Sequence, residues 1–75
     1  MYLIRMKNNH FGMALKELRI ENGLSQTELG QKLGYCNQTI SFWENGQREP
    51  SLDALVSIAT YFGVSIDFML GIDRY

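Results

Sequence analysis

The sequence predicts an all-α fold built from five short helices, and three observations support this prediction. Apolar residues recur at spacings of three and four, the period of an amphipathic helix, and no run alternates strictly enough to define a strand. Residues 25–28 read Ser-Gln-Thr-Glu, the pattern of a helix-capping box. A glycine also stands where each apolar segment stops, as expected of a left-handed residue that ends a helix. These glycines are Gly23, Gly34, Gly46, Gly63 and Gly71.

The first helix is expected at about Asn9–Asn22 and the second from Ser25 to Leu33. In the second, the Ser25 side chain would accept a hydrogen bond from the first turn of the helix. Leu24 and Leu29 are placed for the hydrophobic staple that often accompanies such a cap. The first helix has one apolar face, formed by Phe11, Ala14, Leu15 and Leu18.

The fourth helix is expected after Pro50, with Ser51 as its N-terminal cap. Asp53 then lies in the first turn, where a negative charge interacts favourably with the helix dipole. The fifth helix is expected from Ser65 to Gly71, with Val64 placed to contact Met69 as a hydrophobic staple. The apolar face of the fourth helix consists of Leu52, Leu55, Ile58, Ala59 and Phe62.

The chain divides into a central domain and two short ends. Residues 9–71 form the expected helical domain, residues 1–8 an N-terminal extension, and residues 72–75 a C-terminal tail. In the extension, Tyr2, Ile4 and Met6 alternate with Leu3, Arg5 and Lys7. This alternation leaves two alternatives open, a short strand or a disordered segment.

Composition excludes several classes of protein. With 75 residues, 45% of them hydrophobic, and a mean hydropathy of −0.17, the chain is expected to be one soluble domain. No stretch approaches the roughly 20 apolar residues that span a membrane, and the start does not resemble a signal peptide. A single cysteine and a single histidine exclude an internal disulfide and an ordinary zinc site, which favours a cytoplasmic protein. We expect no metal, no cofactor and, for lack of a nucleophile–base arrangement, no enzyme activity.

Charge is distributed unevenly along the chain. The formal net charge is −1, which by itself argues against a general binder of polyanions. Residues 1–48 contain six Lys or Arg against four Glu, whereas residues 49–75 contain one Arg against four acidic residues. Such asymmetry is compatible with one face that meets an anionic partner, although an ordinary solvated helix surface has the same pattern.

The third helix, expected at about Asn37–Glu44, presents an uncharged polar face. At 100° per residue, Ile40 and Trp43 fall on its buried side. Asn and Gln side chains pair a donor with an acceptor and so suit adenine edges in the DNA major groove, and an aromatic ring can contact a thymine methyl. The alternative is a neutral polar face with the phenyl ring packed on a neighbouring helix. The outward face comprises Gln38, Ser41, Phe42 and Asn45, flanked by Asn37.

The second and third helices are joined by a tight, glycine-containing turn. Two helices connected in this way form a helix-turn-helix, whose second helix enters the major groove of DNA. Gln26 lies at the N-terminus of the second helix, where free N–H groups and the helix dipole favour a phosphate. The loop after the third helix offers a second phosphate-binding position, with Asn45, Gln47 and Arg48.

The run LKELRIENGLSQTELGQKLGYCNQTISFWENGQREPSLDALVSIATYFGVSIDFMLG resembles the phage repressor/Cro-type helix-turn-helix family, also called the XRE family. The resemblance covers about residues 13–71. It implies a compact five-helix, lambda-repressor-like domain that binds a partly palindromic operator as a dimer. By the same resemblance the base-reading positions are Asn37, Gln38, Ser41 and Phe42. The positions that hold the sugar–phosphate backbone are Gln26, Asn45, Gln47 and Arg48.

One pair of positions and one single position complete the comparison with the family. Arg19 matches a first-helix arginine that pairs, in several relatives, with the glutamate that is Glu44 here. We expect a partly buried ion pair between them, because Glu44 lies beside the buried Ile40 and needs a partner. Gly30 stands where alanine is commoner, and both residues are small enough for a close helix contact.

Cys36 occupies a position where Ser or Thr usually caps the third helix. Cysteine is a poor cap, so Asn37 could cap the helix instead and would then not read bases. A thiol near a helix N-terminus could also have a lowered pKa and act as a redox sensor. The favoured alternative is a small, semi-buried turn residue.

The predicted function is sequence-specific binding of double-stranded DNA by a transcriptional regulator, most simply a repressor that occupies an operator as a homodimer. A small core gains stability from association, and one short helix reads few base pairs. The expected dimer surface consists of Phe68, Met69, Leu70 and Ile72, with the segment Tyr2–Met6 as the alternative. The alternative function is that of an antitoxin or anti-repressor that acts through protein–protein contacts, with Phe42 as an anchor.

Overall fold

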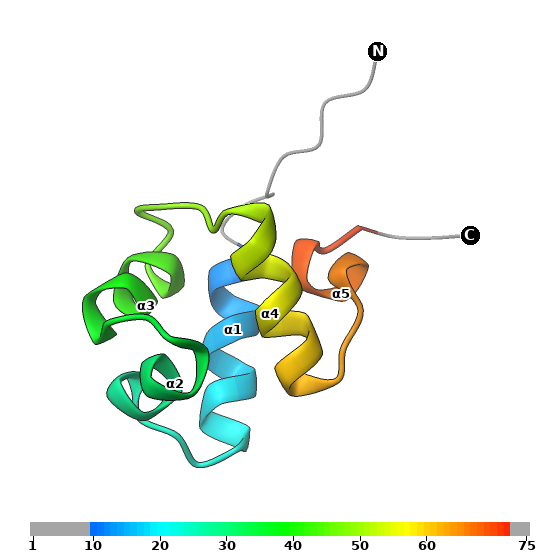
Figure 1. Ribbon diagram of the computed structural model, residues 1–75. Helices are drawn as coiled ribbons and strands as arrows, with labels where there is room; N and C mark the ends of the chain where they lie inside the picture. Colours follow the sequence, from blue (N-terminus) through cyan, green and yellow to red (C-terminus); the bar gives the residue numbers. More distant parts are fainter. Residues whose placement is uncertain (1–9, 73–75) are drawn as a thin grey trace.

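The computed structural model describes residues 10–72, which form five helices. They are α1 (His10–Glu21), α2 (Gln26–Leu33), α3 (Asn37–Glu44), α4 (Leu52–Phe62) and α5 (Ile66–Leu70) (Figure 1). The described residues contain no strand. The all-α prediction is therefore confirmed, and the order and spacing of the five helices agree with it.

Serine caps define where three of the helices begin. The hydroxyls of Ser25, Ser51 and Ser65 each accept a hydrogen bond from the backbone N–H three residues further on. The capping box is complete, because the backbone N–H of Ser25 donates to Glu28 Oε1 at 2.8 Å while that of Glu28 donates to Ser25 Oγ at 3.0 Å. The hydrogen bond from the Ser25 backbone, followed by hydrogen bonding to the Ser25 side chain, lowers the pKa of the Glu28 carboxyl group. All five glycines predicted as helix terminators have positive φ angles.

The boundaries of α1 differ slightly from the expectation. The helix ends at Glu21, one residue early, because Asn22 and Gly23 form a turn in which the Gly23 N–H donates to the carbonyl of Ile20 at 2.9 Å. The expected start at Asn9, the N-terminal extension 1–8 with its two alternatives, and residues 73–75 of the tail lie outside the described residues.

The core lies where the five helices meet. In Figure 1, α1 runs through the middle, with α2 and α3 on one side of it and α5 on the other. Trp43 of α3 anchors this arrangement, because its ring makes edge-to-face contacts with Phe11 of α1 and with Tyr35 at centroid distances of 6.4 and 5.0 Å. The buried apolar side chains are Phe11, Ala14, Leu15, Leu29, Ile40, Trp43, Ala54, Leu55, Ile58, Ala59, Met69 and Leu70.

One residue of the expected apolar face of α4 lies outside the core. Leu52 is 72% exposed, so its assignment to the buried face is wrong. At 100° per residue, the buried face is centred on Leu55, Ile58 and Phe62, and Leu52 falls at its edge. Leu52 is also the first residue of the helix, directly after the cap Ser51.

Candidate nucleic-acid interface

The turn between α2 and α3 is closed by the backbone of Gly30. The N–H groups of Gly34 and Tyr35 both donate to the Gly30 carbonyl, at 2.7 and 2.8 Å. A Cβ atom at position 30 would collide with the carbonyl oxygen of Tyr35. The expectation that alanine would fit equally well here is therefore wrong, because the backbone of the turn crosses α2 too closely for any side chain.

The faces of α3 follow the predicted pattern except at Ser41 and Phe42, which are half-buried. Ile40 and Trp43 are buried, whereas Asn37 and Gln38 are exposed. Ser41 is half-buried and accepts a hydrogen bond from Asn45 Nδ2 at 3.3 Å. The helix thus offers two free amide side chains at its N-terminal end, the end that a recognition helix directs toward bases.

Phe42 departs from the expectation of a freely exposed ring. It is half-buried, and the guanidinium carbon of Arg48 lies 5.0 Å from the ring centroid. The sequence analysis gave two alternatives for this ring, contact with DNA or packing on a neighbouring helix. Neither of them included a contact with Arg48. The face of the ring that Arg48 covers is not available to a base.

Cys36 is the N-terminal cap of α3 and makes no side-chain capping hydrogen bond. Asn37 is the first helical residue, so the alternative in which Asn37 caps the helix is wrong. Cys36 is exposed, which also contradicts the semi-buried alternative. Its Sγ lies 3.3 Å from Thr39 Oγ1, and hydrogen bonding to this hydroxyl lowers the pKa of the thiol.

The expected phosphate-binding residues separate into two groups. Asn45, Gln47 and Arg48 are exposed in the loop after α3. Gln26, at the first position of α2, is half-buried, and its Nε2 donates to Glu44 Oε1 at 3.1 Å. Its side chain is therefore engaged within the protein, while its place at the helix N-terminus is as expected.

The predicted ion pair between Arg19 and Glu44 is confirmed. Arg19 Nε donates to Glu44 Oε2 at 2.6 Å and Nη2 donates to Oε1 at 3.1 Å, an arrangement with two parallel hydrogen bonds. The Arg19 Nη1 group also donates to the carbonyl of Leu24 at 2.8 Å. The Arg19 and Glu44 side chains are only 12% and 2% exposed, and the hydrogen bond to Glu44 raises the pKa of Arg19. Together with Gln26, the pair joins α1, α2 and α3.

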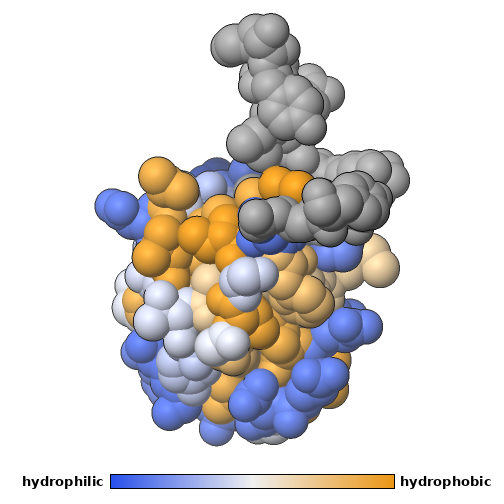
Figure 2. All heavy atoms as spheres, turned by 90° about the vertical axis from the view of Figure 1, so that its right-hand side faces the viewer, coloured by the Kyte–Doolittle hydropathy of each residue, from blue (hydrophilic) through white to orange (hydrophobic). Residues whose placement is uncertain are grey.

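The expected dimer surface is only partly exposed. Met69 is fully buried and Leu70 is 8% exposed, so assigning them to a dimer surface is wrong. Side chains already covered by the core of the domain have no area left to bury against a second copy. Phe68 and Ile72 remain exposed. Figure 2 shows hydrophobic side chains on the face of the molecule that lies to the right in Figure 1, the side on which α5 lies. We use the name α4–α5 apolar surface for the exposed apolar residues of α4, of α5 and of the position just after α5, which are Leu52, Val56, Phe68 and Ile72.

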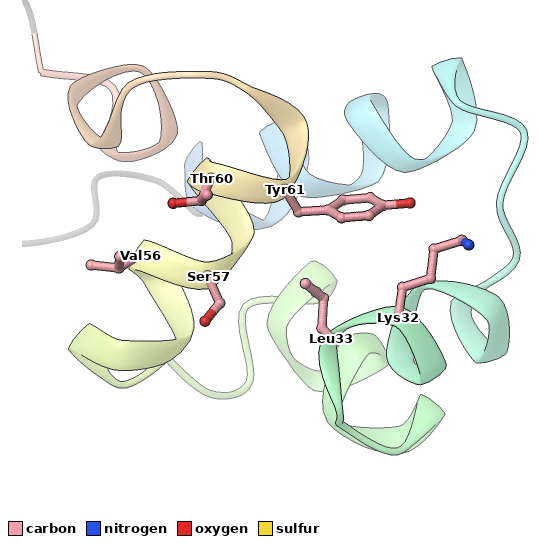
Figure 3. Close-up of a pocket in the computed structure, with 6 residues that line it drawn as sticks. All are labelled: Lys32, Leu33, Val56, Ser57, Thr60 and Tyr61. Carbon is pink, nitrogen blue, oxygen red and sulfur yellow. The ribbon is translucent and has the colours of Figure 1, made fainter.

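A shallow groove of about 380 Å³ lies between α2 and α4 (Figure 3). The ring of Tyr61 extends from α4 toward Lys32 and Leu33 at the end of α2. The other residues that line the groove are Val56, Ser57 and Thr60, so the groove contains hydroxyl groups and one ammonium group. Within residues 10–72 no group of three His, Cys, Asp or Glu is placed to hold a metal ion, and no helix there has the length and apolarity to cross a membrane.

The sequence and the fold both resemble known proteins. A family model described as "Helix-turn-helix" matches residues 15–69. The chain is 37% identical over 63 residues to the HTH-type transcriptional regulator ImmR of Bacillus subtilis, covering 84% of this chain and 50% of ImmR. It is 38% identical over 60 residues to YonR, a regulator derived from the SPbeta prophage of the same species, covering 80% of this chain and 56% of YonR. The chain thus spans about half the length of these relatives.

Among solved structures, the P22 c2 repressor, crystallised in complex with a synthetic operator, superimposes with a TM-score of 0.78 and 28% sequence identity. The superposition covers 84% of this chain and 96% of the repressor chain. The residues that the family model matches, 15–69, include α2, α3 and the turn between them.

Proposed function

Because the chain belongs to the helix-turn-helix family of XRE-type transcriptional regulators, we propose that it binds double-stranded operator DNA sequence-specifically and regulates transcription in the cytoplasm, most simply as a repressor. In this proposal α3 lies in the major groove. Asn37, Gln38 and Ser41 face the bases, with Phe42 on the same helix face. The backbone phosphates are held by the loop after α3 and by the N-terminus of α2, where Gln26 lies.

The observation that carries the proposal is the exposed, uncharged N-terminal end of α3 on this fold. The side-chain amides of Asn37 and Gln38 make no hydrogen bond within residues 10–72, so both are available to bases. A surface helix used only for packing would be expected to carry Lys, Glu or Arg for solubility. An amide side chain can instead donate to and accept from the N7 and N6 edge of adenine.

We also propose that the protein binds a palindromic operator as a homodimer, through the α4–α5 apolar surface. Phe68 is 49% and Leu52 is 72% exposed, which is unfavourable for an isolated domain of this size. To bind two half-sites, the two α3 helices of such a dimer would have to lie about 34 Å apart, one turn of DNA. The expected dimer surface is thereby revised, since Phe68 and Ile72 remain in it while Met69 and Leu70 leave it.

The experiment that tests DNA binding is a footprint of the protein on the DNA upstream of its own gene, followed by titration of Gln38→Ala. We expect this variant to bind the protected site more weakly by about 1–3 kcal/mol, roughly 5- to 150-fold, because one pair of base contacts is lost. Its affinity for unrelated DNA should not change. Lys16→Ala, an exposed change on α1, is the control and should bind like the wild type. Equal losses on all sequences would contradict base reading by Gln38.

The homodimer is tested by sedimentation of Phe68→Lys. A charge at this position should prevent burial of the surface and shift the protein to a monomer, and operator affinity should fall with it. Ile20→Lys is the matched control, because Ile20 is also exposed but lies on α1, and it should leave the oligomeric state unchanged. A wild-type protein that sediments as a monomer at all concentrations, and on its operator, would contradict the homodimer.

A protein-interaction function, as antitoxin or anti-repressor, is the second candidate. It is favoured by the same α4–α5 apolar surface and by the groove of Figure 3, which could both contact a partner protein. If the protein protects no upstream DNA at about 50 mM salt, where electrostatic binding is strong, this function becomes the better supported one.

A further inference from the structure

The side chain of Arg48 packs on an aromatic ring of α3. Its guanidinium carbon lies 5.0 Å from the centroid of the Phe42 ring, within the distance of a cation–π contact. Phe42 is half-buried and Arg48 is exposed. One side of the guanidinium group is thus held by the protein, while its other side remains accessible to a ligand.

Backbone hydrogen bonds of the loop also hold Arg48 against α3. After α3 the chain reverses at Gly46, whose φ of 75° is in the left-handed region. The N–H groups of Gln47 and Arg48 then both donate to the carbonyl of Phe42, at 2.9 and 3.4 Å. Both the backbone and the side chain of Arg48 are therefore fixed relative to α3.

Arg48 is also far from other positively charged residues along the sequence. It is the one Lys or Arg between Lys32 and Arg74 in the sequence. Within residues 10–72 it forms no ion pair, in contrast to Arg19, which is bound to Glu44. Within the described residues Arg48 is therefore a cation close to α3 that is not taken up in an ion pair, with the acidic Glu49 next to it in the sequence.

We propose that Phe42 is a positioning residue for Arg48, and that the Arg48 guanidinium group, held on the Phe42 ring, binds one DNA phosphate beside the groove that α3 enters. This proposal rests on the proposed function and refines it, because it assigns to Phe42 a sequence-independent role instead of contact with a thymine methyl. The ring fixes the guanidinium group at the end of α3, so less side-chain freedom is lost when a phosphate is bound.

The test compares Phe42→Leu, Phe42→Tyr, Arg48→Ala and the double variant Phe42→Leu/Arg48→Ala, titrated with the footprinted operator and with unrelated DNA at several salt concentrations. Arg48→Ala should weaken binding to both DNAs and reduce the salt slope by about one. Phe42→Leu should weaken both by about two- to fivefold, the range of an exposed cation–π contact. In the double variant, Phe42→Leu should lower the affinity for DNA no further than Arg48→Ala alone does. Phe42→Tyr, which keeps an aromatic ring, should bind like the wild type.

Two outcomes would overturn the inference while leaving the proposed function intact. One is a Phe42→Leu variant that loses affinity for the operator alone, with a loss that adds fully to that of Arg48→Ala. The other, which applies even if Phe42→Leu does not fold, is an Arg48→Ala variant that keeps the salt slope of the wild type, because Arg48 would then bind no phosphate. If the wild-type protein binds neither DNA, the proposed function itself is wrong.

Discussion

Arg19→Ala is expected to lower the free energy of unfolding by about 3–5 kcal/mol, the usual effect of removing one partner of a buried ion pair. The carboxylate of Glu44, only 2% exposed, would lose two hydrogen bonds from the guanidinium group and keep the one from Gln26. The carbonyl of Leu24 would lose its side-chain donor as well. For a domain of this size, whose total stability is on the order of 4–11 kcal/mol, such a loss removes a large part of the free energy of unfolding.

Urea denaturation at neutral pH measures this effect. Lys16→Ala is the matched control, because Lys16 lies on the exposed face of the same helix and the substitution removes the same charge. The control should change the free energy of unfolding by less than about 0.5 kcal/mol. An Arg19→Ala protein with the melting temperature of the wild type would show that the pair does not join α1, α2 and α3 energetically.

Gly30→Ala should destabilise the domain by about 1–3 kcal/mol, although alanine has the higher helix propensity. The added methyl group collides with the carbonyl of Tyr35, which is backbone and cannot rotate away. The turn must therefore shift, and the hydrogen bonds from Gly34 and Tyr35 to the Gly30 carbonyl must lengthen or break. Since α3 begins directly after this turn, we also expect operator affinity to decrease in the folded fraction.

Thermal denaturation and operator titration of the same preparation separate the two effects. Gln31→Ala, an exposed substitution at the neighbouring position of α2, is the control and should change neither quantity measurably. A Gly30→Ala protein that is more stable than the wild type would mean that the turn adapts at little cost, and the close approach would then not constrain α3.

The helix ends were predictable because each depends on residues close together in the chain. Ser25 and Glu28 cap each other across three residues, and the five terminator glycines adopt positive φ where the apolar pattern stops. The division of α3 into a buried side with Ile40 and Trp43 and an exposed side with Gln38 also follows from the helical period alone. The Arg19–Glu44 pair was predictable only with the help of the family resemblance, since 25 positions separate the two residues.

Other parts of the site depend on how neighbouring elements pack. Helix α5 has only five residues, too few for the period to define one face, so the burial of Met69 and Leu70 next to the exposed Phe68 could not be inferred. The contact between Arg48 and Phe42 arises because the loop reverses after α3 and returns to it.

The sequence by itself determined five helices, their caps and the amide-bearing face of α3, because these follow from local hydrogen bonding and helical periodicity. Only the tertiary structure decided that Gly30 must lack a side chain, that Gln26 binds Glu44 and that Arg48 lies on Phe42. Each of these features is a contact between separate segments, and its existence depends on the distance and angle at which the helices pack. Such geometry is set by the whole core and is not encoded in any local pattern of residues.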